Sequence, residues 1–227
     1  MISVLVWNYN RPDMIEATIP KWLAQEGVEY EIVLGHGPSI KPPVNAKIRA
    51  VLTPNLRLGQ SYNKLIQEAK GEYLLLTQSD MEVNDPRQLQ RMLEVCKPGY
   101  MVTERFFKNG VRDAGVHLQF MLVRKEDMVA IGGWCEQYDN PDLCAYEDSD
   151  VVARLMKRGL KFKMLETPPD KGVYHIWHQS PDYVNDRVLC ARVENAKELF
   201  FSRHGKGIWQ IYAEQFARMM TEKVCPM

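Results

Sequence analysis

The sequence predicts an α/β fold built on a mostly parallel central sheet flanked by helices. Apolar runs rich in β-branched residues alternate with segments of helical periodicity through the first half of the chain, and most of these runs end in polar residues. A nearly continuous apolar run is typical of a strand buried on both faces, as in parallel sheets. Strand–helix alternation implies a doubly wound order, because parallel neighbours need crossover helices.

The first half of the chain supplies most of the expected sheet. Its clearest strand is the run YLLL at 73–76, which ends in the polar cluster QSD. The helix after the first strand has Asp13 as its expected cap and Pro20 as an expected break or bend. The expected strands are 2–7, 30–35, 47–53 and 72–77, and the expected helices are 13–26, 58–71 and 86–96.

The second half departs from strict alternation. Residues 99–125 show a pattern of strands and loops, which suggests antiparallel additions to the sheet. Acids at the start and bases at the end of 147–160 suit the dipole of a helix. The other expected elements are a short helix at 127–133, strands at 162–166 and 173–178, and a largely helical tail at 182–224. We therefore expect one α/β domain over 1–181 and a C-terminal helical extension over 182–227.

Composition indicates an ordinary globular protein. Of the 227 residues, 45% are hydrophobic and 26% are charged. The 29 basic residues balance 29 acidic ones, and this balance weakens the hypothesis that the protein binds nucleic acid. The five cysteines are scattered without a C-x-x-C motif, as in reduced proteins. The N-terminus lacks the basic region of a signal peptide, and no run of 18 apolar residues predicts a membrane span. We expect a cytoplasmic location.

Polar clusters stand at the ends of several expected elements. Those that follow parallel strands must share one edge of the sheet, where ligands of open α/β sheets bind. Each also has an ordinary interpretation, because a lone acid often begins a turn or caps a helix, and a histidine often makes structural hydrogen bonds. The clusters are Asn8–Arg11, His36–Ser39, Gln78–Glu82 and Glu147–Asp150, followed by His175 and His178.

Taken in order, four stretches resemble the inverting family 2 of nucleotide-sugar glycosyltransferases, which have the GT-A (Rossmann-like) fold. ISVLVWNYNRPDMIEATI resembles that family's first strand and Y-N-R loop, and NLRLGQSYNKLIQEAKGEYLLLTQSDMEV resembles its block leading into the D-x-D metal motif. The most specific stretch, GGWCEQYDNPDLCAYEDSDVVARLMKRG, resembles its GG…ED block, and NAKELFFSRHG resembles a late helix. The resemblance divides the domain into a nucleotide-sugar-binding half, 1–96, and an acceptor-binding and catalytic half, 97–181.

The resemblance implies a divalent metal, Mn²⁺ or Mg²⁺, on the diphosphate of a nucleotide sugar. Asp80 is the expected carboxylate ligand, and a histidine after the ED block would complete the site. The match favours His175 over His178, and the two would point to opposite faces of a strand at 173–178. Carboxylate, phosphate and imidazole together suit such ions.

Two departures from the family pattern concern the donor. The usual D-D-G-S after the second strand is replaced by GHGPS, so His36 or backbone groups would meet the base, and the first acid of D-x-D is replaced by Gln78. The donor expected from the resemblance is a UDP-sugar. The nucleotide-binding candidates are Asn8, Tyr9, Asn10, Arg11, His36, Asn63, Gln78 and Ser79.

On the acceptor side, the family pattern makes Asp148 the general base that deprotonates the attacking hydroxyl. Glu147 would orient the acceptor or support the loop, and Asp150 would face away or support the loop. Trp134, after Gly133, is either an aromatic platform for the acceptor or part of the core. The acceptor would be a glycan or another hydroxyl compound.

Three alternatives remain open at this stage. A glycosyltransferase that acts on modified DNA bases would need a basic surface the size of a groove. A non-catalytic sugar- or nucleotide-binding protein is favoured by the lost acids and disfavoured by the retained EDSD block. A nucleotidyltransferase would have a Gly-rich basic loop after the first strand, where this chain has NYNR.

Overall fold

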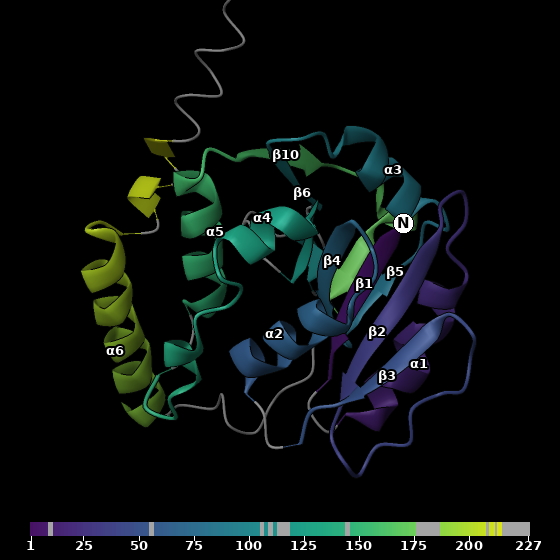
Figure 1. Cartoon of the computed structure of the whole chain (residues 1–227), viewed down its shortest axis with the longest axis horizontal. Coiled ribbons are helices and arrows are strands. Elements are labelled where there is room, and N and C mark those ends of the chain that lie inside the picture. The colour runs from purple at the N-terminus through teal and green to yellow at the C-terminus, as the bar shows by residue number, and fades with distance from the viewer. Residues whose placement is uncertain are drawn as a thin grey trace, which may run out of the picture.

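The central feature of the fold is a seven-stranded sheet with strand order β10-β6-β9-β4-β1-β2-β3 (Figure 1). The structure is a computed structural model of the chain. It describes residues 1–8, 11–54, 57–104, 107–108, 111–112, 119–143, 146–175, 187–207, 209–211 and 213–214. β1 (Ile2–Trp7) is parallel to β2 (Tyr30–His36) and to β4 (Tyr73–Gln78), and β2 is parallel to β3 (Ile48–Leu52).

The second half of the sheet contains the predicted antiparallel addition. β9 (Phe120–Arg124) runs antiparallel to β4 on one side and to β6 (Tyr100–Glu104) on the other, and β10 (Lys161–Leu165) is parallel to β6. A smaller sheet has the order β5-β11-β7-β8, from β5 (Met81–Val83), β7 (Phe107–Lys108), β8 (Val111–Arg112) and β11 (Val173–His175). The α/β class with a mostly parallel central sheet is therefore confirmed.

The helices cover both faces of the large sheet because side chains alternate along each strand. Ile2, Val4 and Val6 pack with α1 and α3 on one face, whereas Leu5 packs with α2, α4 and α5 on the other. The helices are α1 (Pro12–Leu23), α2 (Leu58–Glu68), α3 (Gln88–Val95), α4 (Lys125–Ala130), α5 (Glu147–Lys157) and α6 (Arg187–His204), with short 3-10 turns η1 (Glu136–Asp139) and η2 (Pro169–Lys171).

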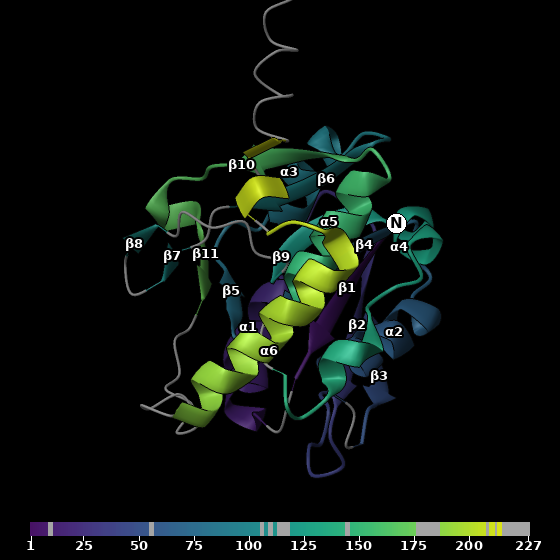
Figure 2. The same ribbon diagram turned by 90° about the vertical axis from the view of Figure 1, so that its left-hand side faces the viewer.

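The helical tail begins with α6, which lies alongside α5 in both views of the molecule (Figures 1 and 2). The contact is polar as well as apolar, because Arg203 and His204 of α6 bind Asp150 of α5. The division into a domain over 1–181 and an extension over 182–227 stays a prediction.

Two details of α1 differ from the sequence-based expectation. Asp13 does not cap the helix, because α1 begins at Pro12 and the Asp13 carboxylate instead pairs with Arg11. Pro20 does not break the helix, which continues to Leu23. Burial of Ile19 and Trp22 on either side of the proline stabilises the last turn against the lost backbone hydrogen bond.

The described part of the chain contains no helix long and apolar enough to cross a membrane. Among the predicted reduced cysteines, Cys96 and Cys135 are free thiols. Burial raises the pKa of the Cys96 thiol to about 12.

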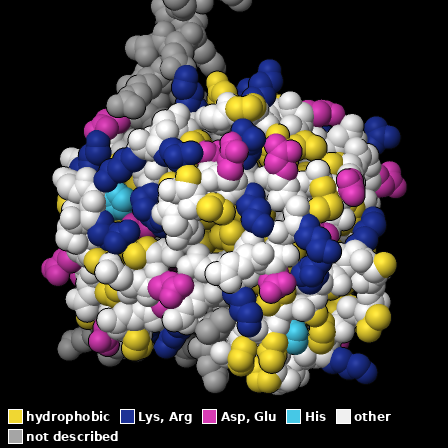
Figure 3. Space-filling view, viewed as in Figure 1, with side chains coloured by type: hydrophobic (Ala, Val, Ile, Leu, Met, Phe, Trp, Pro, Cys, Tyr) yellow, Lys and Arg dark blue, Asp and Glu magenta, His cyan; other side chains and the backbone are white. Residues whose placement is uncertain are grey.

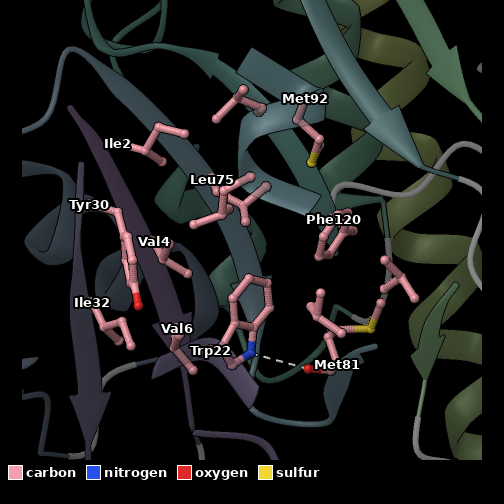
Figure 4. Packing of buried hydrophobic residues seen from close by; sticks show 14 of the residues in the cluster. Ile2, Val4, Val6, Trp22, Tyr30, Ile32, Leu75, Met81, Met92 and Phe120 are labelled. Atoms are coloured by element: carbon pink, nitrogen blue, oxygen red, sulfur yellow. Dashed lines mark hydrogen bonds between the residues drawn. The ribbon is translucent and has the colours of Figure 1, made fainter. Parts of the chain in front are cut away.

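Trp22 is the largest side chain buried against the face that α1 covers. Its indole N–H donates to the Met81 carbonyl at 3.2 Å, and its ring stacks with Phe120 at a centroid distance of 5.8 Å (Figure 4). Because it joins α1 to β5 and β9, Trp22 ties the two sheets together.

We expect Trp22→Ala to lower the free energy of unfolding by about 3–5 kcal/mol, since a large cavity and an unpaired carbonyl replace the indole. Urea unfolding followed by circular dichroism measures the change. Trp209→Ala is the matched control, because Trp209 is 76% exposed and its loss should change the stability by less than about 0.5 kcal/mol. Equal losses in both variants would contradict this account of the core.

Candidate active site

The polar residues predicted after β1, β2 and β4 do meet at one edge of the sheet. Trp7 lies opposite Gly35 of β2 and opposite Gln78 of β4, so the three strands end at the same level. His36 is the last residue of β2, and Gln78 is the last of β4. Tyr9, Asn10 and His178, which were also predicted for the site, lie outside the described residues.

Ser79 holds the turn that follows β4 in place through three hydrogen bonds. Its N–H donates to the Trp7 carbonyl at 2.9 Å, and its hydroxyl donates to Asn8 Oδ1 at 2.8 Å. Its carbonyl accepts from the Thr18 hydroxyl at 2.8 Å. Asn8 is 2% exposed, and its Nδ2 has no hydrogen-bond partner among the residues that the structure describes. The Asn8 amide is therefore a donor at this edge that can serve a ligand.

Asp80, in the turn between β4 and β5, lies next to His175, the last residue of β11. β11 pairs antiparallel with β5 and places His175 opposite Met81, next to Asp80. The His175 Nε2 lies 3.1 Å from Asp80 Oδ2, and both side chains are nearly buried. No group of three or more potential metal-binding side chains occurs in the described part of the chain, so this site has two protein donors there, one oxygen and one nitrogen.

Arg11 and His36 flank this edge. The guanidinium of Arg11 forms two hydrogen bonds with Asp13, at 3.0 and 2.7 Å, and these bonds raise its pKa, with Asp80 adding a smaller effect of the same sign. The His36 Nδ1 lies 2.9 Å from the Gly37 carbonyl. Because a carbonyl only accepts, Nδ1 carries the hydrogen, and Nε2 of the neutral ring is left as an acceptor.

Tyr62 of α2, which the sequence reasoning did not single out, lies between the two acidic clusters. Its ring stacks on Trp134 at a centroid distance of 4.6 Å, and its hydroxyl donates to the Thr77 carbonyl. Burial raises the pKa of Tyr62 well above its ordinary value, and the charges of Asp80 and Asp148 raise it further. Trp134 is 4% exposed, so the structure places it in the core, with one face covered by Tyr62. Its role as an acceptor platform stays a prediction.

Asn63 contacts the turn around Trp134. Its Oδ1 accepts from the Trp134 N–H at 2.7 Å, and its Nδ2 donates to the Trp134 carbonyl and to Glu136. A Cβ on Gly133, which has φ of +70°, would lie 2.4 Å from Asn63 Oδ1, so this close approach requires glycine. The structure thus gives Asn63 and Gly133 a packing role, and their predicted ligand contacts remain untested.

Asp139 was also missed by the sequence reasoning, although it completes the amino end of α2. Its two carboxylate oxygens accept from the N–H groups of Gly59 and Gln60 at 2.9 and 2.8 Å. Arg57, which precedes α2, has no capping side-chain bond, so a residue 80 positions away supplies the cap. Such a long-range cap leaves no local sequence signal.

Glu147 and Asp148 begin α5 directly after a strained residue. Tyr146 has φ of +68° and is the non-glycine residue with positive φ in the described chain. Burial, with the nearby charge of Asp148, raises the pKa of Glu147 to about 7. Asp148 Oδ1 accepts from the Ser149 N–H at 2.7 Å. The Glu147 carboxyl is thus easily protonated, and it lies beside the Asp148 carboxyl at the amino end of α5.

Comparison with known proteins identifies the family to which the chain belongs. The sequence model of Glycosyl transferase family 2 matches residues 3–145, well over half of the chain. The chain belongs to glycosyl transferase family 2. No curated protein matches the sequence closely enough to count as a relative.

Solved structures place this family 2 chain in the GT-A fold. A Staphylococcus aureus TarS fragment, 1–349, in complex with UDP-GlcNAc superposes with a TM-score of 0.64 at 13% identity, over 82% of this chain and 61% of that one. A Pyrobaculum calidifontis mannosyltransferase, PcManGT, in complex with GDP-Man and Mn²⁺ gives 0.59 at 16% identity, over 79% and 58%. The chain therefore spans about three fifths of the length of these structures, and the likeness shows the fold.

The raised pKa of Glu147 makes the stability of the family 2 domain depend on pH. A carboxyl whose pKa rises from 4.5 to about 7 on folding stabilises the fold below the lower value, and this contribution is lost as the pH rises through the higher one. We expect the free energy of unfolding of Glu147→Gln to rise relative to that of the wild type by about 1–3 kcal/mol as the pH goes from 5 to 8. Urea unfolding at both pH values measures the gain.

Glu16→Gln, on the exposed face of α1, is the control and should show the same difference from wild type at both pH values. A pH-independent effect of Glu147→Gln would show that Glu147 is ionised throughout this range.

Proposed function

We propose that the chain transfers a sugar from a nucleoside diphosphate sugar to an acceptor hydroxyl, with a divalent metal and with inversion at the anomeric carbon. The observation that carries this proposal is the meeting of Asp80 and His175 at the sheet edge, within 3.1 Å of each other. Family membership supports glycosyl transfer, and the metal, the stereochemistry and the acceptor are parts of the proposal.

The donor atoms at Asp80 and His175 fit a hard or borderline cation. One carboxylate oxygen and one imidazole nitrogen suit Mn²⁺, and Mg²⁺ commonly takes one or two carboxylates together with substrate phosphates. The mannosyltransferase structure contains both Mn²⁺ and GDP-Man, which supports a metal on this fold. A bound metal would neutralise charge that develops on the diphosphate leaving group.

The donor base would lie toward the end of β2. His36 Nε2, left as an acceptor by the bond of Nδ1 to Gly37, suits a base that presents a ring N–H, such as uracil or guanine. Asn8 Nδ2 provides a buried donor beside Ser79 for a phosphate or ribose oxygen. UDP-GlcNAc in the TarS complex supports a uridine nucleotide as the first candidate.

Asp148 is the proposed general base. It lies in the first turn of α5, where the helix dipole favours the ionised carboxylate. Glu147 beside it is easily protonated, and its neutral form can donate a hydrogen bond to an acceptor oxygen. In a single displacement Asp148 would take the proton of the acceptor hydroxyl as that oxygen attacks the anomeric carbon. The bond from that carbon to the diphosphate oxygen would break at the same time, and the nucleoside diphosphate would leave.

The face shown in Figure 3 and the neutral net charge favour a glycan or another hydroxyl compound over DNA as the acceptor. Figure 3 shows Lys and Arg side chains interspersed with Asp and Glu over one face of the molecule, without a continuous basic groove. A neutral net charge agrees with this pattern. The proposed acceptor is therefore a glycan or another hydroxyl compound.

Metal-dependent nucleotide binding tests the donor site. We expect calorimetry with UDP, GDP, CDP and TDP to show tighter binding of at least one nucleotide when Mn²⁺ is present. Asp80→Ala and His175→Ala should each weaken this metal-dependent binding about 10–100-fold, because each removes one of two protein donors. Asp85→Asn, an acid beyond β5, is the matched control. Binding of no nucleotide by the folded wild type would favour a non-catalytic role.

Removal of the proposed base tests the chemistry separately from binding. We expect Asp148→Asn to lower the rate of transfer, or of donor hydrolysis, about 10²–10⁴-fold while nucleotide binding stays unchanged. Rates come from nucleotide diphosphate release, and binding comes from calorimetry on the same preparation. Unchanged turnover in Asp148→Asn would remove this residue from the mechanism.

A further inference from the structure

We infer that α6 acts as a clamp that positions Glu147 and Asp148, with Arg203 and His204 as positioning residues that act through Asp150. The catalytic part of this inference rests on the proposed function, whereas the clamp itself rests on contacts in the structure. α6 lies against α5 and contacts the 131–150 segment at several separate points (Figure 2).

Asp150 is the centre of the clamp. Its side chain is fully buried, and its Oδ1 accepts from Arg203 Nε and His204 Nε2, both at 2.9 Å. Its Oδ2 accepts from Arg154 at 2.7 Å. Burial alone would raise the pKa of Asp150, but the bond from His204 and the charges of the two arginines lower it below its ordinary value. An ionised carboxylate therefore joins α5 to α6.

The same cations extend the contact to the turn before α5. Arg154 Nη1 donates to the carbonyls of Ile131 and Gly133 at 2.6 and 2.7 Å. Arg203 Nη1 donates to Gln137 of η1 at 3.2 Å. Both arginines thus bind Asp150 and the 131–139 region at once. Movement of α6, which carries Arg203, would therefore be transmitted to Asp150 and to the 131–139 region.

A second group of contacts lies closer to the acids. The ring of Tyr146, the strained residue before Glu147, packs against Phe200 of α6 at a centroid distance of 5.5 Å. The Phe200 ring in turn lies 4.4 Å from that of His204. Burial of the Tyr146 ring against α6 offsets the cost of its left-handed backbone, which sets the direction in which the chain enters α5.

Nearer the start of α6, two side chains bind the backbone just before the undescribed residues 144–145. Arg192 donates to the Leu143 carbonyl, and Asn195 donates to the Asp142 carbonyl, both at 3.3 Å. α6 therefore contacts the chain on both sides of Glu147 and Asp148. The donor side has its own supports, because Ser79 and Asp80 are held by β1, α1 and β11. Loosening α6 should affect the acids of α5 and leave the donor site intact.

The test compares His204→Leu, His204→Gln and Arg203→Met in the full chain, with Lys197→Met as the control. Gln retains an N–H at the position of His Nε2, whereas Leu removes it. Lys197 is a partly exposed base on the same helix and pairs only with Glu194 among the contacts described. Each variant is measured by hydrogen exchange of backbone amides, by nucleotide binding and by release of nucleotide diphosphate from a nucleotide sugar.

We expect His204→Leu and Arg203→Met to speed exchange in 131–150 about tenfold, while exchange in β1 and β4 stays unchanged. kcat should fall about 10–100-fold, with little change in nucleotide affinity or KM for the donor. In His204→Gln, exchange in 131–150 and kcat should both stay close to the wild-type values. Lys197→Met should resemble the wild type.

Two results would overturn the clamp: unchanged exchange in 131–150, or faster exchange over the whole chain. Faster exchange in 131–150 with unchanged kcat would overturn the positioning roles of Arg203 and His204. If the wild type binds no nucleotide, the proposed function fails, and the exchange measurement still decides whether the clamp exists.

Discussion

The register of β1 with its two parallel neighbours is the constraint on which the site depends. Trp7 lies opposite both Gly35 and Gln78, so the residues that follow the three strands meet at one level. The register is strongly determined because both faces are buried, and a slip of one residue would exchange the side chains that pack under α1 with those that pack under α2. The donor half of the site is thus a consequence of core packing.

Most of the fold follows from local patterns, and much of the site does not. The periodicity of apolar residues and the positions of turn residues were sufficient to predict β1, β2, β4, α2 and α5 to within a few residues. They could not predict β5, which has three residues and exists because β11 pairs with it. The same pairing brings His175 to Asp80, so both residues were predictable as candidates and their 3.1 Å contact was predictable only through the family resemblance.

Helix α2 connects the two halves of the domain through polar and aromatic contacts. Tyr62 stacks on Trp134, Asn63 binds the backbone of the same residue, and Asp139 caps the amino end of the helix. Each partner is more than 70 positions away along the chain, so no periodicity in the sequence could reveal the pairing. The same is true of Asp150, because an acid in the first turn of a helix resembles an ordinary dipole contact until α6 is placed beside it.

The outer strands of the large sheet have a consequence for how the protein behaves at high concentration. β3 and β10 are the two edges, and an edge strand is a template for pairing with another molecule. β10 carries Lys161 and Lys163, so two copies that paired along this edge would bring like charges together. The other edge offers Leu52, which is 46% exposed, and the charge of Arg49 in that strand is paired with Glu31. Self-association by strand addition would therefore begin at β3.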